Sequence, residues 1–177
     1  AKYRKLGRTA SQRKALLRNQ VTALLSNGKI VTTEAKAKEI RKQVESLIAL
    51  AVKEKDNYEE VTVKAKVARK DADGKRVKEV VDGKKVTVYD EVEKTITKDK
   101  PSRLHARRQM LKVLFPVKEG EKKHMKEVDM VATLFDEIAP KYADRNGGYT
   151  RIVKIGQRQG DAAMALQIQL VYSILHF

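Results

Sequence analysis

The side chains with the clearest chemical capacity in this sequence are the basic ones of its first third. Residues 1–53 contain thirteen Lys and Arg against three Glu, a local net charge of +10 out of +16 for all 177 residues. Three carboxylates cannot neutralise thirteen cations, and charge held this densely repels itself unless a polyanion binds. Arginine donates forked hydrogen bonds to phosphate, and lysine supplies a mobile point charge. We predict polyanion binding by the basic residues of the arm 1–10 and the helix after it: Arg4, Lys5, Arg8, Arg13, Lys14 and Arg18.

A second basic cluster lies between residues 103 and 108. Leu104 is predicted to face the core together with Leu111 and Leu114, which leaves Arg107 and Arg108 pointing outward. His105 beside them is better suited to donate to phosphate or backbone than to catalyse. Solvent-facing arginines on a helix are the simpler alternative, but a link to the first cluster through one fold favours RNA contact.

A third cluster, residues 145–151, places flexible glycine amides beside Tyr149 and Arg151. A tyrosine can stack on a base or sugar, and an arginine can bind phosphate. The Asn-Gly-Gly sequence is also typical of an ordinary turn. A nucleotide-binding phosphate loop is disfavoured, because a strand rather than a helix follows and no Gly-Lys-Ser/Thr occurs.

Signals of catalysis, cofactors or metals are poor. The chain has no Cys, and its three histidines, His105, His124 and His176, have no zinc-ligand spacing. No nucleophile elbow occurs, and the carboxylates lie in mixed-charge runs that would not tune an acid–base pair. We therefore expect no enzyme activity, no cofactor, no metal and no small-molecule substrate.

The absence of Cys is compatible with a reducing cytoplasm, and the basic composition meets a first criterion for a nucleic-acid partner. The sequence pI is about 9.9, and no apolar run reaches the 18 or so residues of a membrane span. The N-terminus lacks a signal-peptide core, so we expect neither export nor membrane insertion. Charge alone is also compatible with an acidic protein surface or an anionic membrane.

The apolar pattern predicts a basic arm over 1–10 and an α/β core made of 11–53 and 101–177. Helices are expected at 11–26, capped by Thr9 or Ser11, and after a Thr33 cap, with strand 29–32 between them. The second helix carries an apolar stripe with Lys36 and Lys38 outside it. Further helices are predicted at 103–114 and 126–139, a charged loop at 118–123, and strands at 149–155 and 163–172.

The middle segment, 54–100, differs in residue pattern and charge from the segments on either side of it. Its Val-rich alternation and its Asp73-Gly74 and Asp82-Gly83 pairs predict a small inserted β-meander. Thirteen bases and twelve acids leave it a net charge of +1. The fold class is therefore α+β, a two-layer α/β domain of order α-β-α-α-α-β-β with a mainly β insertion that has no electrostatic role.

Several sequence blocks in one order resemble the bacterial large-subunit ribosomal protein L17 family. They are 4–9 (RKLGRT) with 12–19 (QRKALLRN), 32–39 (TTEAKAKE), 104–109 (LHARRQ), 134–142, and 145–155 with 160–163 (GDAA). The resemblance implies a ribosomal-protein fold and a structural constituent of the large ribosomal subunit. Such a protein binds large-subunit ribosomal RNA and neighbouring ribosomal proteins near the nascent-chain tunnel exit, supports assembly and translation, and resides in the cytoplasm on the ribosome.

The family's RNA contacts carry over only onto matching positions of this chain. These are Arg4, Lys5, Arg8, Arg13, Lys14, Arg18, Lys36, Lys38, Arg107, Arg108, Tyr149 and Arg151. The insertion of about 47 residues departs from the short link usual in the family, and the apolar tail 172–177 has no match. We expect the insertion to be a species-specific surface that is peripheral to RNA binding.

Two other functions use the same features. An RNA-processing enzyme could bind its substrate on the basic surface and use His105 or a carboxylate for chemistry. A DNA-compacting protein would prefer duplexes, although no DNA-reading helix motif is visible.

Overall fold

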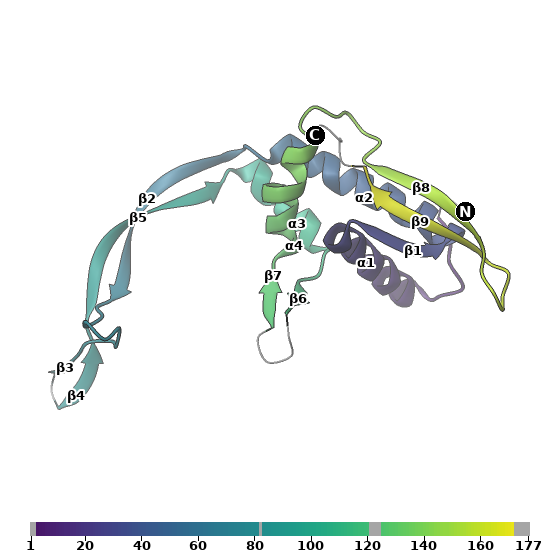
Figure 1. Cartoon of the computed structure of the whole chain (residues 1–177). Helices are drawn as coiled ribbons and strands as arrows, with labels where there is room; N and C mark the ends of the chain where they lie inside the picture. Colours follow the sequence, from purple (N-terminus) through teal and green to yellow (C-terminus); the bar gives the residue numbers. More distant parts are fainter. Residues whose placement is uncertain (1–2, 82, 121–124, 172–177) are drawn as a thin grey trace. The chain divides into compact units, whose positions relative to one another are not determined.

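A computed structural model describes residues 3–81, 83–120 and 125–171 (Figure 1). The chain divides into two compact units, one formed by 1–57 with 101–177 and the other by 58–100. The tail 172–177 and residues 121–123 of the predicted charged loop lie outside the described residues. Helix and strand are both well represented, so the α+β class is confirmed at that level.

The first helix, α1 (Ala10–Asn27), begins and ends as its sequence predicts. Thr9 Oγ1 accepts from the Gln12 backbone N–H at 3.5 Å, and Gln12 Oε1 accepts from the Thr9 N–H at 3.3 Å. These reciprocal bonds form a capping box. Gly28 ends the helix at φ 72°, where its N–H donates to Leu24 O at 2.9 Å. A side chain at this left-handed position would be strained, which explains the Asn-Gly stop.

Strand β1 (Lys29–Thr33) leads into α2 (Glu34–Glu54). Thr33 precedes the helix as predicted, but its side chain makes no capping hydrogen bond, so that part of the prediction is wrong. Glu34 lies in the first turn, where its charge complements the helix dipole. The predicted apolar stripe is confirmed, with every member buried: Ala37, Ile40, Val44, Leu47, Ile48 and Ala51.

A three-stranded antiparallel sheet of order β1-β9-β8 packs against α1 and α2 (Figure 1). β8 spans Thr150–Gln157 and β9 spans Met164–Leu170. Ile30, Ile168 and Ile152 lie opposite one another across the three strands, and Ile168 is fully buried. One face of the sheet therefore supplies apolar side chains to the core.

The segment between the insertion and β8 differs most from its prediction. α3 (Pro101–Leu111) begins two residues before the predicted helix 103–114 and ends three residues short of its predicted end. Residues 126–128 form strand β7 (Lys126–Val128) instead of the start of a helix. This strand pairs with β6 (Val117–Glu119), so the predicted loop is wrong at residues 118 and 119. Asp129 Oδ1 accepts from the Val131 N–H at 2.9 Å, which makes α4 (Met130–Thr133) begin only at Met130. A π-helical turn (Leu134–Ile138) and a 3-10 turn (Ala139–Tyr142) continue it.

The core-facing side of α3 was also predicted wrongly. Leu104 is 37 % and Leu111 53 % exposed, whereas Arg103, Ala106 and Met110 are buried. The helix turns this way because the Arg103 guanidinium lies over the Phe135 ring, 4.5 Å from its centre.

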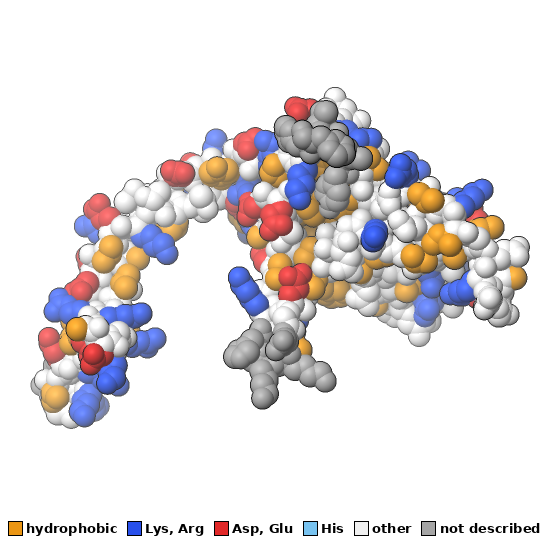
Figure 2. All heavy atoms as spheres, viewed as in Figure 1, with side chains coloured by type: hydrophobic (Ala, Val, Ile, Leu, Met, Phe, Trp, Pro, Cys, Tyr) orange, Lys and Arg blue, Asp and Glu red, His pale blue; other side chains and the backbone are white. Residues whose placement is uncertain are grey.

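The 58–100 unit contains β2 (Tyr58–Ala68), β3 (Lys78–Val81), β4 (Lys84–Thr87) and β5 (Tyr89–Asp99). β2 pairs with β5 and β3 with β4, so the predicted meander, in which consecutive strands pair, is wrong. The register places Val61 opposite Ile96 and Ala65 opposite Val92. This alignment of apolar positions favours the outer pairing, and acidic and basic side chains are intermixed on the unit's surface (Figure 2).

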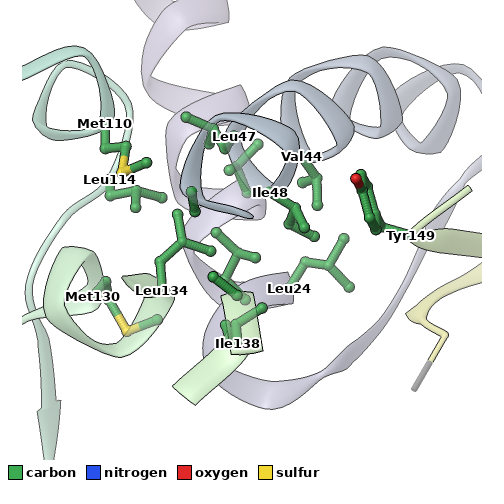
Figure 3. Packing of buried hydrophobic residues seen from close by; sticks show 14 of the residues in the cluster. Leu24, Val44, Leu47, Ile48, Met110, Leu114, Met130, Leu134, Ile138 and Tyr149 are labelled. Carbon is green, nitrogen blue, oxygen red and sulfur yellow. The ribbon is translucent and has the colours of Figure 1, made fainter. Parts of the chain in front are cut away.

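The aliphatic core of the other unit draws on every helix and on the sheet (Figure 3). Leu24 comes from α1, and Val44, Leu47 and Ile48 come from α2. Met110 lies in α3 and Leu114 just after it, while Met130, Leu134 and Ile138 come from α4 and the π-helical turn. Tyr149, the residue before β8, completes the set.

The two chain segments that border the insertion, the end of α2 and the start of α3, are joined by a small network of hydrogen bonds. Ser102 Oγ donates to Glu54 Oε2 at 2.9 Å, and Asn57 Nδ2 donates to the same oxygen at 2.8 Å and also to Ser102. Glu54 is buried, and these bonds, that from Asn57 first, lower its pKa. The α2 end and the α3 start thus meet through a charged group satisfied by neutral donors.

Candidate nucleic-acid interface

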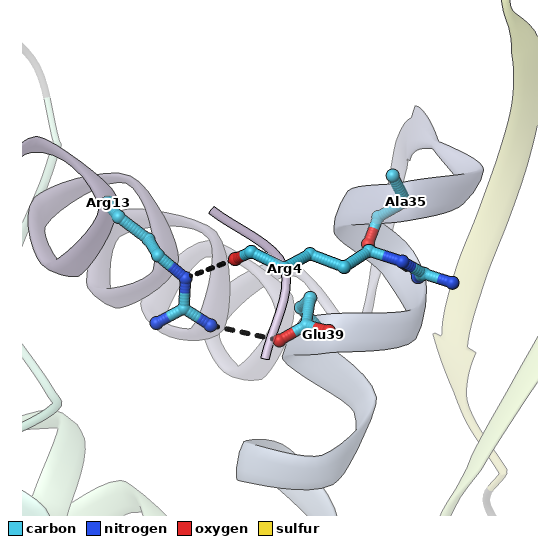
Figure 4. A network of polar contacts seen from close by, with 4 residues as sticks. All are labelled: Arg4, Arg13, Ala35 and Glu39. Atoms are coloured by element: carbon cyan, nitrogen blue, oxygen red, sulfur yellow. Dashed lines mark hydrogen bonds and ion pairs between the residues drawn. The ribbon is translucent and has the colours of Figure 1, made fainter. Parts of the chain in front are cut away.

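The basic arm is tied to both long helices through Arg13 (Figure 4). Arg13 Nε donates to Arg4 O at 2.6 Å, and its Nη2 donates to Glu39 Oε2 at 2.9 Å. Arg4 Nη1 reaches Ala35 O of α2 at 3.5 Å. Leu6 also packs against the core. One half-buried arginine thereby fixes the arm's backbone, and the arm's own cations remain at the surface.

Around this anchor the cations of the arm line a hollow of about 400 Å³. Its walls are Tyr3, Arg4, Lys5, Arg8, Thr9, Ala10 and Arg13. None of the described residues that line it is a carboxylate, and Arg4, Lys5, Arg8 and the neighbouring Lys14 are all exposed. A concave surface lined by several cations and no acid favours a phosphate-bearing ligand.

Arg18, predicted for RNA contact, has internal partners on the other side of α1. Its Nε donates to Val113 O at 3.1 Å and its Nη2 to Leu114 O at 3.3 Å. Its guanidinium also stacks on Phe115, 3.8 Å from the ring centre. Phosphate would have to compete with these bonds, as it would with those of Arg13. We therefore assign Arg13 and Arg18 a structural role, in which their internal hydrogen bonds fix the backbone around the basic surface.

At the start of α2, Lys36 is half-buried and Lys38 is exposed. Lys38 Nζ lies 2.5 Å from Glu34 Oε1, and this hydrogen bond lowers the pKa of Glu34. An exposed pair of this kind contributes little to stability, because water screens it and holding two long side chains in one geometry costs entropy. Lys38 can therefore readily exchange Glu34 for a phosphate.

On α3, Arg108 is exposed and Arg107 is half-buried. The Arg107 guanidinium lies 5.4 Å from the centre of the Phe135 ring, which the Arg103 guanidinium also approaches. Arg103 Nη2 is 3.8 Å from Asp136 Oδ1. Arg103 was not among the residues predicted to have a specific role. Its position four residues before Arg107 places the two side chains on one helix face, which was the available signal.

The prediction that Tyr149 stacks on a base is wrong. Its side chain is 4 % exposed, its ring meets Tyr142 edge-on at 5.2 Å, and its hydroxyl donates to Arg145 O at 3.1 Å. A ring buried in this way belongs to the core. Of this cluster, Arg151 alone among the residues predicted for RNA contact is exposed, on the outer face of the sheet.

Glu45, which sequence reasoning missed, holds the start of β8 against α2. Its two carboxylate oxygens accept from the Tyr149 N–H at 3.0 Å, the Thr150 N–H at 2.8 Å and Thr150 Oγ1 at 2.6 Å. The available signal was the scarcity of acids in residues 1–53, where three carboxylates stand among thirteen bases. A carboxylate kept in such a basic segment indicates a structural role. Glu39, which accepts from Arg13, likewise has an internal partner, whereas Glu34 pairs with Lys38 at the surface.

The loop between β8 and β9 carries an exposed ion pair. Arg158 Nε donates to Asp161 Oδ1 at 3.0 Å, and this pairing, with the Ala163 N–H, lowers the pKa of Asp161 to about 2. Arg158 therefore adds a cation next to the sheet and also pairs within its own loop.

Within the described ranges, no three His, Cys, Asp or Glu side chains gather closely enough to hold a metal ion. No helix there combines the length and apolar character needed to cross a membrane. The remaining feature is a set of exposed cations on a domain with a packed aliphatic core.

Comparison with known proteins agrees with the sequence resemblance. A family model described as Ribosomal protein L17 matches residues 16–87 and 82–171. A protein of Lachnospira eligens named Large ribosomal subunit protein bL17 is 71 % identical over 97 % of this chain and 99 % of its own length. Proteins with the same name from Acetivibrio thermocellus and Clostridium botulinum are 49 % and 39 % identical, over 95 % and 97 % of this chain and 98 % and 99 % of their own.

Proposed function

Since the chain belongs to the ribosomal protein L17 family, we propose that it is a structural, non-enzymatic constituent of the large ribosomal subunit of bacteria. It binds large-subunit ribosomal RNA, contacts neighbouring ribosomal proteins near the nascent-chain tunnel exit, and supports assembly and translation on cytoplasmic ribosomes.

The hollow lined by the arm carries this proposal. Arg4, Lys5 and Arg8 present their cations on a backbone that Arg13 and Glu39 fix, so less conformational entropy is lost when phosphates bind. Lys14 continues the surface along α1, Lys36 and Lys38 lie on α2, and Arg108 and Arg151 contribute from α3 and the sheet. Arg107 lies beside Arg108 and contributes its half-buried cation.

RNA affinity measured against salt concentration tests the proposal. The triple variant R4A/K5A/R8A should bind large-subunit ribosomal RNA more weakly, with a log–log salt slope shallower by about 0.7–0.9 for each phosphate that the variant no longer neutralises. The variant K70A/K75A/K78A removes the same charge from the insertion and serves as the matched control. Its slope should equal that of the wild type.

Incorporation into ribosomes gives the second measurement. In sucrose gradients the wild type and the control should be stoichiometric with large subunits, and the arm variant should be depleted from them. Circular dichroism must show all three proteins folded. Equal slopes for the two triple variants would overturn the assignment of the arm, and absence of the wild type from large subunits would overturn the function.

A further inference from the structure

A second hollow adjoins the cation-lined hollow of the arm. It has a volume of about 620 Å³ and is lined by residues of the arm, α1, α2 and α3 and by Val113, just after α3. Tyr3 and Arg13 line both hollows. Because the two hollows share these side chains, one ligand can occupy both.

One face of α2 forms a wall of the second hollow. Its lining residues recur three or four positions apart, at positions 39, 42, 43, 46, 47 and 50, which places them on one side of the helix. Leu47 is buried and Leu50 is half-buried, and Val113 adds a third aliphatic side chain. Aliphatic side chains of this kind can pack on the flat face of a planar ligand.

Tyr3 supplies an aromatic ring where the two hollows meet. Its side chain is 55 % exposed, and the Arg13 guanidinium lies over the ring, 5.9 Å from its centre. Unstacked RNA bases stack on aromatic rings and on arginine guanidinium groups. Among the described residues that line the two hollows, Tyr3 is the one aromatic side chain.

Gln43 supplies hydrogen-bonding groups to the same hollow. It is half-buried, and its side-chain amide has no hydrogen-bond partner within the described part of the chain. An amide both donates and accepts, so it can pair with the edge of a base, as glutamine does with adenine.

The charge of the second hollow is compatible with RNA. Its described lining residues include two cations, Arg13 and Lys42, and one carboxylate, Glu39. That carboxylate is already paired with Arg13 at 2.9 Å, and Lys42 is exposed. The hollow therefore does not repel a polyanion.

Together the two hollows match the parts of a nucleotide. One is lined by cations that bind phosphate, and the other by aliphatic, aromatic and amide groups that bind a base. A protein side chain would fit the second hollow but would make no use of the adjoining cations. A base within a regular helix is stacked on both sides and cannot enter, so the occupant must be unpaired.

We propose that the second hollow receives an unpaired base of large-subunit ribosomal RNA, stacked on Tyr3 and paired at its edge with Gln43. The phosphates next to this base occupy the cation-lined hollow. This inference rests on the proposed function, because it specifies the kind of RNA that the basic arm binds. The base contact selects a looped or bulged nucleotide, whereas phosphate contacts alone carry no such information.

Binding to two single-stranded oligomers separates base contacts from phosphate contacts. One oligomer is an RNA of mixed sequence, and the other has the same length and the same phosphates but lacks every base. The full-length wild type should bind the base-bearing oligomer about tenfold more tightly, the effect expected of one stacked base. The log–log salt slopes should be equal, because both oligomers carry the same phosphates.

Variants of the two contact residues locate the base. Y3L keeps an apolar side chain without a ring and should lose most of the preference for the base-bearing oligomer, whereas Y3F keeps the ring and should retain it. Q43M keeps the length of the side chain without its hydrogen-bonding groups and should reduce the preference about threefold. The matched control Y89L removes a tyrosine of similar exposure, 54 %, from the insertion and should bind as the wild type does.

The salt slope distinguishes stacking from a structural role of Tyr3. If Y3L merely displaced the arm, it would bind both oligomers more weakly and with a shallower slope. That result, an unchanged preference in Y3L, an equal loss in Y89L, or no preference in the wild type would each overturn the base-binding hollow.

Incorporation into large subunits separates the remaining outcomes. A Y3L protein that binds both oligomers like the wild type but is missing from large subunits would assign the hollow to a protein side chain instead of a base. If the wild type itself is absent from large subunits, the proposed function fails, so the two failures are distinguishable.

Discussion

The N-terminal third and the 58–100 insertion use carboxylates in opposite ways. In residues 1–53, Glu39 and Glu45 bind internally, to Arg13 and to the start of β8, and Glu34 pairs with Lys38. In the insertion, acids and bases are intermixed on exposed strands and pair across them, as Glu59 of β2 does with Lys98 of β5. Residues 1–53 therefore have a surplus of positive charge because they contain few acids, and two of these acids have internal structural partners. The insertion is close to neutral because it contains many acids on its surface.

The difference also appears in how apolar residues are used. Ile48 of α2 is completely buried, whereas Ile96 of β5 is 41 % exposed. One unit is stabilised by its own core, and the other presents aliphatic side chains on a narrow ribbon. Matched substitutions in the two regions should therefore have unequal effects on stability.

The largest expected difference is between I48A and I96A in the isolated protein. I48A removes three carbons from a closely packed site and should lower the free energy of unfolding by about 2–5 kcal/mol. I96A removes the same atoms from a partly hydrated face and should cost under about 1 kcal/mol. Urea denaturation followed by circular dichroism measures both, and similar costs would contradict the proposed contrast between core and ribbon.

A smaller difference is expected between two carboxylates. E45A leaves the Tyr149 and Thr150 N–H groups without their acceptor, which should cost about 2–3 kcal/mol. E91A changes an exposed position of the ribbon and should stay within about 0.5 kcal/mol of the wild type. The same denaturation experiment applies, and E45Q, which keeps one acceptor oxygen, should fall between them.

The smallest effects concern pH and salt. The pKa of Glu54 is lowered by hydrogen bonds from Asn57 and Ser102, and that of Asp90 by its bond to Arg69. A carboxyl group whose pKa is lower in the folded than in the unfolded state stabilises the fold above its unfolded pKa, near 4. That stabilisation disappears as pH falls through the folded value. The stability advantage of wild type over E54Q, and over D90N, should therefore shrink on titration from pH 6 downward.

Salt should separate the two groups, because one has neutral partners and the other a cation. At 1 M ionic strength the Debye length is about 3 Å, so the exposed Asp90–Arg69 pair is screened. The advantage over D90N should then fall, while the advantage over E54Q should persist. Thermal unfolding at low and high salt measures this, and equal salt sensitivity would count against neutral hydrogen bonding as the cause at Glu54.

Sequence patterns predicted the long, regular elements well. The capping residue Thr9, the stop at Gly28 and the buried stripe of α2 follow from local rules, and all are confirmed. Prediction failed where one tertiary contact decides the outcome. Arg103 of α3 points inward because its guanidinium packs on the Phe135 ring. Strand β2 pairs with β5 and not with β3, the next strand in the sequence.

The candidate interface shows the same division. The sequence by itself determined that a basic surplus exists, that it is concentrated in residues 1–53, and which family the ordered motifs resemble, because composition and motif order do not depend on the path of the chain. Tertiary structure decided which cations remain at the surface. Arg13 meets Glu39 across 26 residues, Arg18 meets Val113 across 95, and Glu45 meets Thr150 across 105. Such pairings depend on distance in space, which only the packed helices and sheet define.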